Sequence, residues 1–268
     1  PTTALDVTVQ KEIILLLKSL QKEYGMSILF ISHDLSLVQS IADRIIVMYQ
    51  GRIVEQGTAK AIFDHPKEAY TRALIASRPS TKTRLRNLPT IKDFVEHSVS
   101  DELVTKEQRE ESHQKIYQTA ALLQVIDVVK DYPLKKKLFS KQKYFRAVDG
   151  VSFNLYPGES LGLVGESGCG KSTLGDLILR LKEVTSGSII YRDQDITHLV
   201  GLPMRQLRKE IQIIFQDPFA SLNPRLTVGQ AILEPMKWHG IGTDNADRKH
   251  KVLNLLKRVG LTEQHYNR

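Results

Sequence analysis

Eight consecutive residues have the types and the spacing needed to hold a phosphate group. They fit the pattern G-x-x-x-x-G-K-[ST] and run Gly165-Glu166-Ser167-Gly168-Cys169-Gly170-Lys171-Ser172, with Thr173 next. Glycines let the backbone turn sharply, so that successive N–H groups point at one anion, and the N-terminus of a following helix adds positive potential. Lys171 supplies a mobile charge for phosphates, and the Ser172 hydroxyl is an oxygen ligand that suits Mg²⁺. We call residues 165–172 the phosphate loop; a glycine-rich structural turn is the alternative.

Two polar residues follow apolar runs and are candidates for the same chemistry. His33 comes after the run 27–32, at the carboxyl end where ligand sites of α/β sheets lie, so its imidazole could hold a phosphate oxygen. Gln216 ends the run 211–215, and an uncharged amide can orient a water or a Mg²⁺ ligand without changing the charge of a site. The alternatives are a structural histidine and a glutamine that caps a loop.

The single cysteine and a basic stretch each allow two interpretations. Cys169 cannot form an intrachain disulfide, which favours a reducing compartment. A helix N-terminus lowers a thiol pKa, so a redox role is conceivable, but a small residue at a tolerant loop position is the simpler interpretation. The basic stretch is predicted to be a solvated face, with lipid headgroups or nucleic acid as the alternative; it contains Lys135, Lys136, Lys137, Lys141, Lys143 and Arg146.

The first part of the chain reads as alternating helices and strands. Helical spacing over 6–25 predicts a helix with Asp6 as N-cap and Gly25 as C-cap. Asp34 is predicted to cap a helix over 35–42. The apolar run 27–32 is typical of a strand buried on both faces of a parallel sheet. A hairpin over 44–49 and 52–56 and helices over 58–65 and 68–77 follow.

A polar segment separates this part from a second unit. Residues 78–119 are predicted to be a linker with one exposed helix around 105–117. The pattern then predicts strands over 122–132, 151–155, 160–164, 188–191 and 211–215, with a helix over 171–182. Strands that alternate with helices favour an α/β fold.

Composition excludes several classes of protein. The 268 residues carry a formal charge of +8, with 41% hydrophobic and 25% charged residues, as in globular proteins rather than collagen, low-complexity disorder or disulfide scaffolds. No apolar run approaches the ~18 residues of a membrane helix, and no basic-then-apolar start marks a signal peptide.

These motifs resemble the ATP-binding subunits of ABC transporters, in the tandem form of the oligopeptide/dipeptide importer branch. The phosphate loop is similar to the Walker A motif, and Ile213-Ile214-Phe215-Gln216-Asp217-Pro218 to the Q-loop. Ser221-Leu222-Asn223-Pro224-Arg225 is typical of the branch. Ala4-Leu5-Asp6 resembles the D-loop, Ser32-His33-Asp34 the switch histidine, and Tyr70-Thr71-Arg72-Ala73-Leu74 the C-terminal tail.

The resemblance implies a P-loop ATPase fold with a parallel core sheet and an antiparallel β subdomain, present here as two incomplete domains. Residues 1–77 would be the end of a first ATPase domain, 78–121 a linker, and 122–268 the start of a second. The signature and Walker B motifs of both domains are missing from this sequence. We therefore expect a fragment that binds nucleotide weakly at most and does not hydrolyse ATP by itself.

The resemblance also implies roles for individual residues. His33 would act on the γ-phosphate of one site, and Gln216 would orient water and Mg²⁺ at the other, with Ser172 as a second Mg²⁺ ligand. Asp6 would lie beside the partner domain's phosphate loop, although capping a helix explains this residue equally well. Tyr132 occupies about the position where the family stacks an aromatic ring on adenine; Tyr144 or Phe145 could serve instead.

The expected function of the intact protein is ATP hydrolysis coupled to import of peptides or similar small solutes. The implied ligands are ATP and Mg²⁺. The implied partners are membrane-spanning permease subunits, a solute-binding protein indirectly, and a pseudo-dimer of the two ATPase domains, without nucleic acid. The implied location is peripheral, at the cytoplasmic face of the inner membrane. The alternatives are a soluble ABC ATPase that acts on nucleic acid or ribosomes, and a non-catalytic regulatory module.

Overall fold

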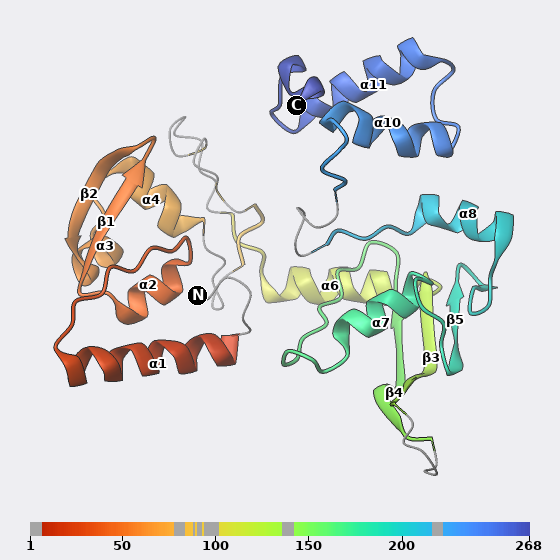
Figure 1. The fold of residues 1–268 in the computed structure, drawn as a ribbon, viewed down its shortest axis with the longest axis horizontal. Coiled ribbons are helices and arrows are strands. Elements are labelled where there is room, and N and C mark those ends of the chain that lie inside the picture. Colours follow the sequence, from red (N-terminus) through yellow and green to blue (C-terminus); the bar gives the residue numbers. More distant parts are fainter. Residues whose placement is uncertain are drawn as a thin grey trace. The chain divides into compact units, whose positions relative to one another are not determined.

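The computed structural model describes residues 7–77, 84–87, 89, 93, 102–135, 142–215 and 222–268 (Figure 1). In chain order, its elements are α1 (Val7–Tyr24), α2 (Leu35–Ile41), β1 (Arg44–Tyr49), β2 (Arg52–Thr58), α3 (Ala59–Asp64), α4 (Ala69–Ala76), α6 (Lys106–Tyr117), β3 (Leu123–Pro133), β4 (Tyr144–Leu155), α7 (Lys171–Ile178), β5 (Ser186–Tyr191), β6 (Gln194–Asp195), α8 (Gly201–Glu210), α10 (Val228–Trp238), α11 (Asn245–Arg258) and the 3₁₀ helix η1 (Glu263–Asn267).

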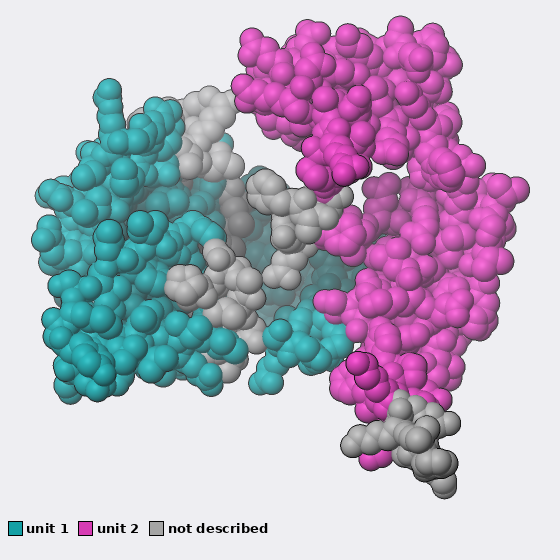
Figure 2. Space-filling view, in the orientation of Figure 1, with its two compact units in different colours: residues 1–122, 154–171 teal, residues 123–153, 172–268 magenta. Residues whose placement is uncertain are grey.

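The chain forms two compact units, shown in different colours in Figure 2. The first comprises residues 1–122 and 154–171, and the second residues 123–153 and 172–268. No helix among the described residues is long and apolar enough to cross a membrane. The domain boundaries expected from the sequence remain a prediction.

A β-hairpin and a short helix form the core of the first unit. Strands β1 and β2 pair antiparallel around Gln50 and Gly51, which both have positive φ, +48° and +77°. Such a pair of left-handed residues matches the twist of a tight two-residue hairpin turn. Ile45 and Val47 alternate with exposed neighbours and pack with Ile62 of α3. The hairpin and both following helices, α3 and α4, confirm the sequence prediction.

Two helix ends in the first unit are also as predicted. Helix α1 ends at Tyr24, and Gly25 takes the left-handed conformation (φ +61°) that commonly follows a helix. The Asp34 carboxylate caps α2, because its Oδ1 accepts hydrogen bonds from the backbone N–H groups of Ser36 at 2.8 Å and Leu37 at 3.3 Å. The predicted cap Asp6 lies outside the described residues.

Three predicted strands are not strands in the structure: 27–32, 160–164 and 211–215. Each segment leaves apolar side chains in solvent, with Ile31 87%, Val164 89% and Ile214 98% exposed, although Ile28, Phe30 and Ile211 are half-buried. The continuous apolar runs predicted strands of a parallel sheet, but such a strand needs neighbours for its N–H and C=O groups. No described strand pairs with these segments. The α/β class and the antiparallel β subdomain are confirmed, and the described residues show no parallel pairing for these three segments.

The second unit contains a four-stranded sheet in the order β4-β3-β5-β6. Strand β3 pairs antiparallel with β5, so that Val125 lies opposite Ile189, and both are buried. The register shifts after Ile126, where Asp127 has a left-handed φ of +47°. Gly187 of β5 faces this bulge so closely that an added Cβ would lie 2.2 Å from the Asp127 carbonyl oxygen. The sheet therefore requires glycine at this position.

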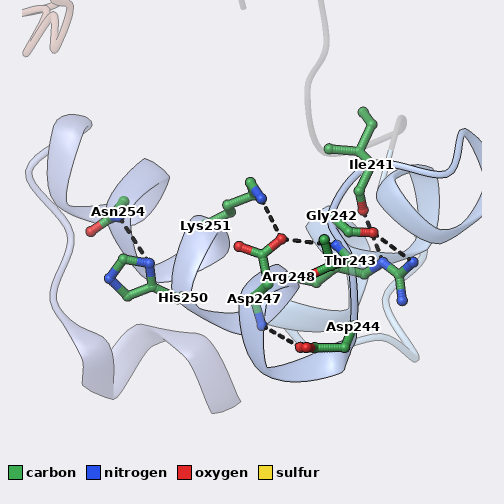
Figure 3. A network of polar contacts seen from close by, with 9 residues as sticks. All are labelled: Ile241, Gly242, Thr243, Asp244, Asp247, Arg248, His250, Lys251 and Asn254. Carbon is green, nitrogen blue, oxygen red and sulfur yellow. Dashed lines mark hydrogen bonds and ion pairs between the residues drawn. The ribbon is translucent and has the colours of Figure 1, made fainter.

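Helices α7, α8, α10 and α11 complete the second unit. Helix α7 ends at Ile178, four residues before the predicted end, because Arg180 is left-handed at φ +52°. Helices α10 and α11 share a core with Met236, Val252 and Leu256 buried in it. At the start of α11, the Asp244 carboxylate caps the helix through the N–H of Asp247 at 2.8 Å (Figure 3).

The same helix start closes its preceding loop with a second set of contacts. The Asp247 carboxylate accepts from the N–H of Thr243 at 3.0 Å and pairs with Lys251 (Figure 3). These two contacts, with that of Lys251 first, lower the pKa of Asp247. The Arg248 guanidinium donates to the carbonyls of Ile241 and Gly242 at 2.9 and 3.1 Å, which fastens the turn between α10 and α11.

The predicted linker helix is confirmed and is strongly capped. Thr105 and Gln108 form a reciprocal capping box at the start of α6. Just ahead of it, Leu85 and Leu103 form an antiparallel bridge, and an ion pair joins Arg86 and Glu102 at 3.1 Å. The linker therefore carries local structure of its own.

Candidate functional site

The phosphate loop leaves the exposed segment 160–164 and enters helix α7 at Lys171. Gly168 and Gly170 have φ values of +79° and +100°, which only glycine adopts readily. An added Cβ on Gly165 would lie 2.7 Å from the Cys169 Sγ atom. The glycines of the motif are therefore required by the path of the backbone, as the sequence predicted.

Lys171 folds back over the loop that precedes it. Its Nζ donates hydrogen bonds to the carbonyl oxygens of Gly165 and Glu166, both at 2.7 Å, and lies 3.5 Å from Cys169 Sγ. The turn itself is closed by the Cys169 N–H, which donates to the Glu166 carbonyl at 3.3 Å. The loop residues 165–169 are exposed, so an anion can approach their N–H groups. To reach that anion, the ammonium would exchange two carbonyl oxygens for phosphate oxygens.

The remaining loop residues differ in exposure. Ser167 and Ser172 are exposed, and Thr173 is half-buried in the first turn of α7. Cys169 is a free thiol on the loop surface.

The Ser172 hydroxyl is a hard oxygen donor, as Mg²⁺ prefers. The described residues contain no group of three His, Cys, Asp or Glu side chains that could hold a metal. Among the described residues of the loop, Ser172 is therefore the predicted Mg²⁺ ligand, and the second, Gln216, lies outside them.

Tyr132 lies near the end of β3 with its ring between cationic side chains. The Nζ atoms of Lys130 and Lys182 lie 5.3 and 5.7 Å from the ring centroid. Lys182 also pairs with Asp176 at 2.8 Å, and this partner raises the pKa of Lys182. A half-buried ring of this kind offers a π face for a base, provided that one ammonium moves aside. Sequence reasoning missed both lysines, because their positions, 52 residues apart, give no local signal.

His33 lies just before the N-cap of α2 and is distant in sequence from the phosphate loop. Its side chain is exposed, next to the half-buried cap Asp34, whose N–H donates to Ser32 Oγ at 3.0 Å. The local turn therefore presents the imidazole to solvent while its neighbours hold the backbone. Gln216 and Asp6 lie outside the described residues, so their predicted roles remain predictions.

The alternative aromatic residues at the end of the β3–β4 hairpin are exposed. Tyr144 and Phe145 are 60% and 55% exposed, whereas Tyr132 is half-buried. Nearby, the Arg146 guanidinium pairs with Asp131 and Asp149, although its side chain remains half exposed. At least this member of the basic stretch therefore has a structural partner.

Two protein-family models match the sequence. The model "ABC transporter" matches residues 148–268, and "Oligopeptide/dipeptide transporter, C-terminal region" matches residues 54–101. The first match contains the phosphate loop, and the second begins in strand β2.

Similar proteins carry names consistent with these models. The glutathione import ATP-binding proteins GsiA of Salmonella typhimurium (strain LT2) and Escherichia coli (strain K12) are each 45% identical to the chain, over 267 and 268 residues. Each match covers 99% of this chain and 42% of the relative, so the chain spans less than half the length of these relatives.

Solved structures give weaker similarities. The dimeric cassette MJ0796 bound to ADP and phosphate is 25% identical, with a TM-score of 0.46, over 54% of this chain and 60% of that one. CbiO1 from Clostridium perfringens is 25% identical, with a TM-score of 0.42, over 56% and 54%. The family models and the sequence identity to GsiA lead to one conclusion: residues 148–268 belong to the ABC transporter family and residues 54–101 to the C-terminal region of oligopeptide/dipeptide transporters.

Proposed function

We propose that the protein containing these residues hydrolyses ATP and couples the reaction to import of peptides or similar small solutes. The observation that carries the proposal is the phosphate loop, in which Gly168 and Gly170 adopt left-handed conformations ahead of Lys171. This loop lies within the residues matched by the ABC transporter model. The naming of the GsiA relatives as glutathione importers supports a small peptide as the solute.

In this proposal, the phosphate loop and its lysine bind the triphosphate. The N–H groups of residues 165–172 would hold phosphate oxygens, and Lys171 would neutralise charge on the β- and γ-phosphates. Ser172 and Gln216 would contact Mg²⁺, which supplies further charge neutralisation when bound. Tyr132 would stack on adenine. Phosphoryl transfer to water depends mainly on such positioning and charge stabilisation.

The remaining predicted residues act across the two ATPase domains. We propose domains at 1–77 and 122–268, joined by the linker 78–121, which form a pseudo-dimer. His33 would contact the γ-phosphate of one site, and Asp6 would lie beside the phosphate loop of the other. The partners would be membrane-spanning permease subunits and, indirectly, a solute-binding protein, with the ATPase attached to the cytoplasmic face of the inner membrane.

Nucleotide binding by the full-length protein tests the central claim. Substitution Lys171→Ala should weaken binding of a fluorescent ATP analogue by about tenfold or more, since a charge-assisted phosphate contact contributes ~1.5–3 kcal/mol. The matched control is Lys60→Ala, which removes an exposed lysine of α3 and should leave the affinity unchanged. Equal affinity of Lys171→Ala and wild type would refute the proposal, and salt-dependent RNA binding would favour the nucleic-acid alternative.

A further inference from the structure

Helix α6 is mostly exposed to solvent, and its specific tertiary contacts are made by the residue at its C-terminus. Apart from the half-buried Ile116, every residue of α6 is exposed, and most of its side chains are polar or charged. Packing therefore does little to hold it in place. Its last residue, Tyr117, makes specific contacts with the turn 156–159, which belongs to the same compact unit as α6.

The contact between Tyr117 and this turn has both a polar and an aromatic part. The Tyr117 hydroxyl donates a hydrogen bond to Glu159 Oε1 at 3.2 Å. The ring of Tyr117 meets that of Tyr156 edge-on, with centroids 5.2 Å apart, which is a favourable geometry for an aromatic pair. The hydrogen bond from Tyr117 to the Glu159 carboxylate also raises the pKa of Tyr117.

The Glu159 carboxylate joins this contact to the backbone of the turn. Its second oxygen, Oε2, accepts a hydrogen bond from the Tyr156 N–H at 2.9 Å, and the Glu159 N–H donates to the Tyr156 carbonyl at 3.1 Å. One carboxylate therefore connects the tyrosine of α6 with the backbone that defines the turn. Loss of Oε1 as an acceptor would remove the bond from Tyr117, and loss of Oε2 would remove the bond from the Tyr156 N–H.

A second connection lies five residues after Tyr117. The N–H of Leu122 donates to the Leu155 carbonyl at 2.8 Å, at the end of β4. The segment 117–122 and the segment 155–159 are thus joined at two points, one at the last residue of α6 and one just ahead of strand β3. A movement of α6 would therefore pull on the turn through Tyr117.

The turn lies only a few residues before the phosphate loop in the sequence. Only residues 160–164 separate Glu159 from Gly165, and an extended chain spans at most ~3.3–3.6 Å per residue. The side chains of Leu161, Leu163 and Val164 are exposed, so burial does not fix this short stretch. The position of the turn therefore limits where the phosphate loop can lie.

We propose that Tyr117 and Glu159 form a latch through which helix α6, in the segment that links the two proposed domains, positions the phosphate loop for nucleotide binding. This inference rests on the proposed function, in which the loop binds ATP. Tyr117 and Glu159 are positioning residues: they act on the nucleotide through the turn 156–159 and do not touch it. Displacement of α6 by movement of the linker would lower the affinity for ATP.

The test removes single hydrogen-bonding groups from the full-length protein. Tyr117→Phe keeps the ring and removes only the hydroxyl; we expect the Kd and the KM for Mg-ATP to rise by about twofold to tenfold, with kcat unchanged within twofold. Glu159→Gln leaves one acceptor oxygen in place of two and should have a similar effect. The double variant should be no weaker than the weaker single variant, because the two residues act as one unit.

A matched substitution and Lys171→Ala separate the possible outcomes. Tyr24→Phe removes the hydroxyl of another exposed tyrosine, at the end of α1, and should change neither constant. Unchanged Kd in Tyr117→Phe, together with weakened binding in Lys171→Ala, would overturn the latch and leave the proposed function intact. A lower kcat with unchanged KM would also overturn it, because a merely structural role lowers the active fraction. Full binding by Lys171→Ala would instead refute the proposed function.

Discussion

Arg146 binds the carboxylate of Asp131 through two hydrogen bonds. Its Nε lies 2.9 Å from Oδ1 and its Nη2 3.2 Å from Oδ2, and its Nη1 reaches Asp149 Oδ1 at 3.0 Å. A guanidinium matches a carboxylate in this two-point geometry better than any other side chain. The contact joins β3 to β4 one residue before Tyr132, so it holds the strand end that carries the candidate adenine-stacking ring.

This ion pair predicts a dependence of stability on pH. The hydrogen bonds from Arg146 hold the pKa of Asp131 below its ordinary value of 3.8. A carboxylate with a lowered pKa in the folded state stabilises that state above the unfolded-state pKa, and the effect is lost as pH falls through the folded-state pKa. Asp131→Asn should therefore lower the Tm at pH 7, and the difference from wild type should shrink below about pH 4. A difference that does not change with pH would contradict this.

The bulge in β3 predicts a sharp intolerance at Gly187. Gly187→Ala would place Cβ against the Asp127 backbone and would also adopt a left-handed φ, so the free energy of unfolding should fall by about 3 kcal/mol or more. Gly260→Ala is the matched control, because its φ of +76° is similar and nothing lies within 4 Å of the added Cβ. Its cost should be only about 1–2 kcal/mol. Equal costs, measured by urea unfolding, would mean that the close approach is not important.

Tyr132 is predicted to contribute to ATP affinity through its ring. Base–aromatic stacking contributes ~1–3 kcal/mol by alanine substitution, so Tyr132→Ala should weaken ATP binding by about fivefold to hundredfold. Tyr132→Phe keeps the π face and should bind nearly as well as wild type. The measurement is a titration of the full-length protein with ATP and, in parallel, with inorganic triphosphate, which has no base. A loss of triphosphate binding in Tyr132→Ala would assign the effect to folding instead of stacking.

Substitutions at the adjacent residues His33 and Asp34 should have different effects, one on ATP turnover and the other on stability. Asp34→Ala removes the cap of α2 and should cost ~1 kcal/mol of stability. His33→Ala removes an exposed ring and should leave stability unchanged, while ATP turnover by the full-length protein falls by about tenfold or more. Thermal unfolding and steady-state ATPase assays on both variants distinguish the two effects. Normal turnover in His33→Ala would show that the histidine has no part in hydrolysis.

Local signals in the sequence predicted the elements whose structure is set by near neighbours. Asp34, Gly25 and the turn at Gln50–Gly51 act within a few residues, so their types were sufficient. The runs 27–32, 160–164 and 211–215 do not form strands as predicted, because a strand depends on a distant partner as well as on apolar side chains. The same reason explains why the contact between residues 117 and 159 could not be predicted.

The same distinction between local and long-range contacts decides which parts of the candidate site the sequence predicts. The phosphate loop was predictable because its glycines, lysine and serine are consecutive, and the required backbone conformations follow from the glycines themselves. The lysines beside Tyr132 were not predictable, because β3 and the residues after α7 bring them together only in the fold.

The solvent exposure of Leu29, Val164 and Ile214 has a consequence for how these 268 residues behave on their own. Exposed apolar stretches whose backbone is not paired in a sheet promote aggregation and are bound by chaperones. A preparation of these 268 residues alone should therefore elute as a mixture of soluble aggregates and chaperone-bound material, with little sharp monomer peak.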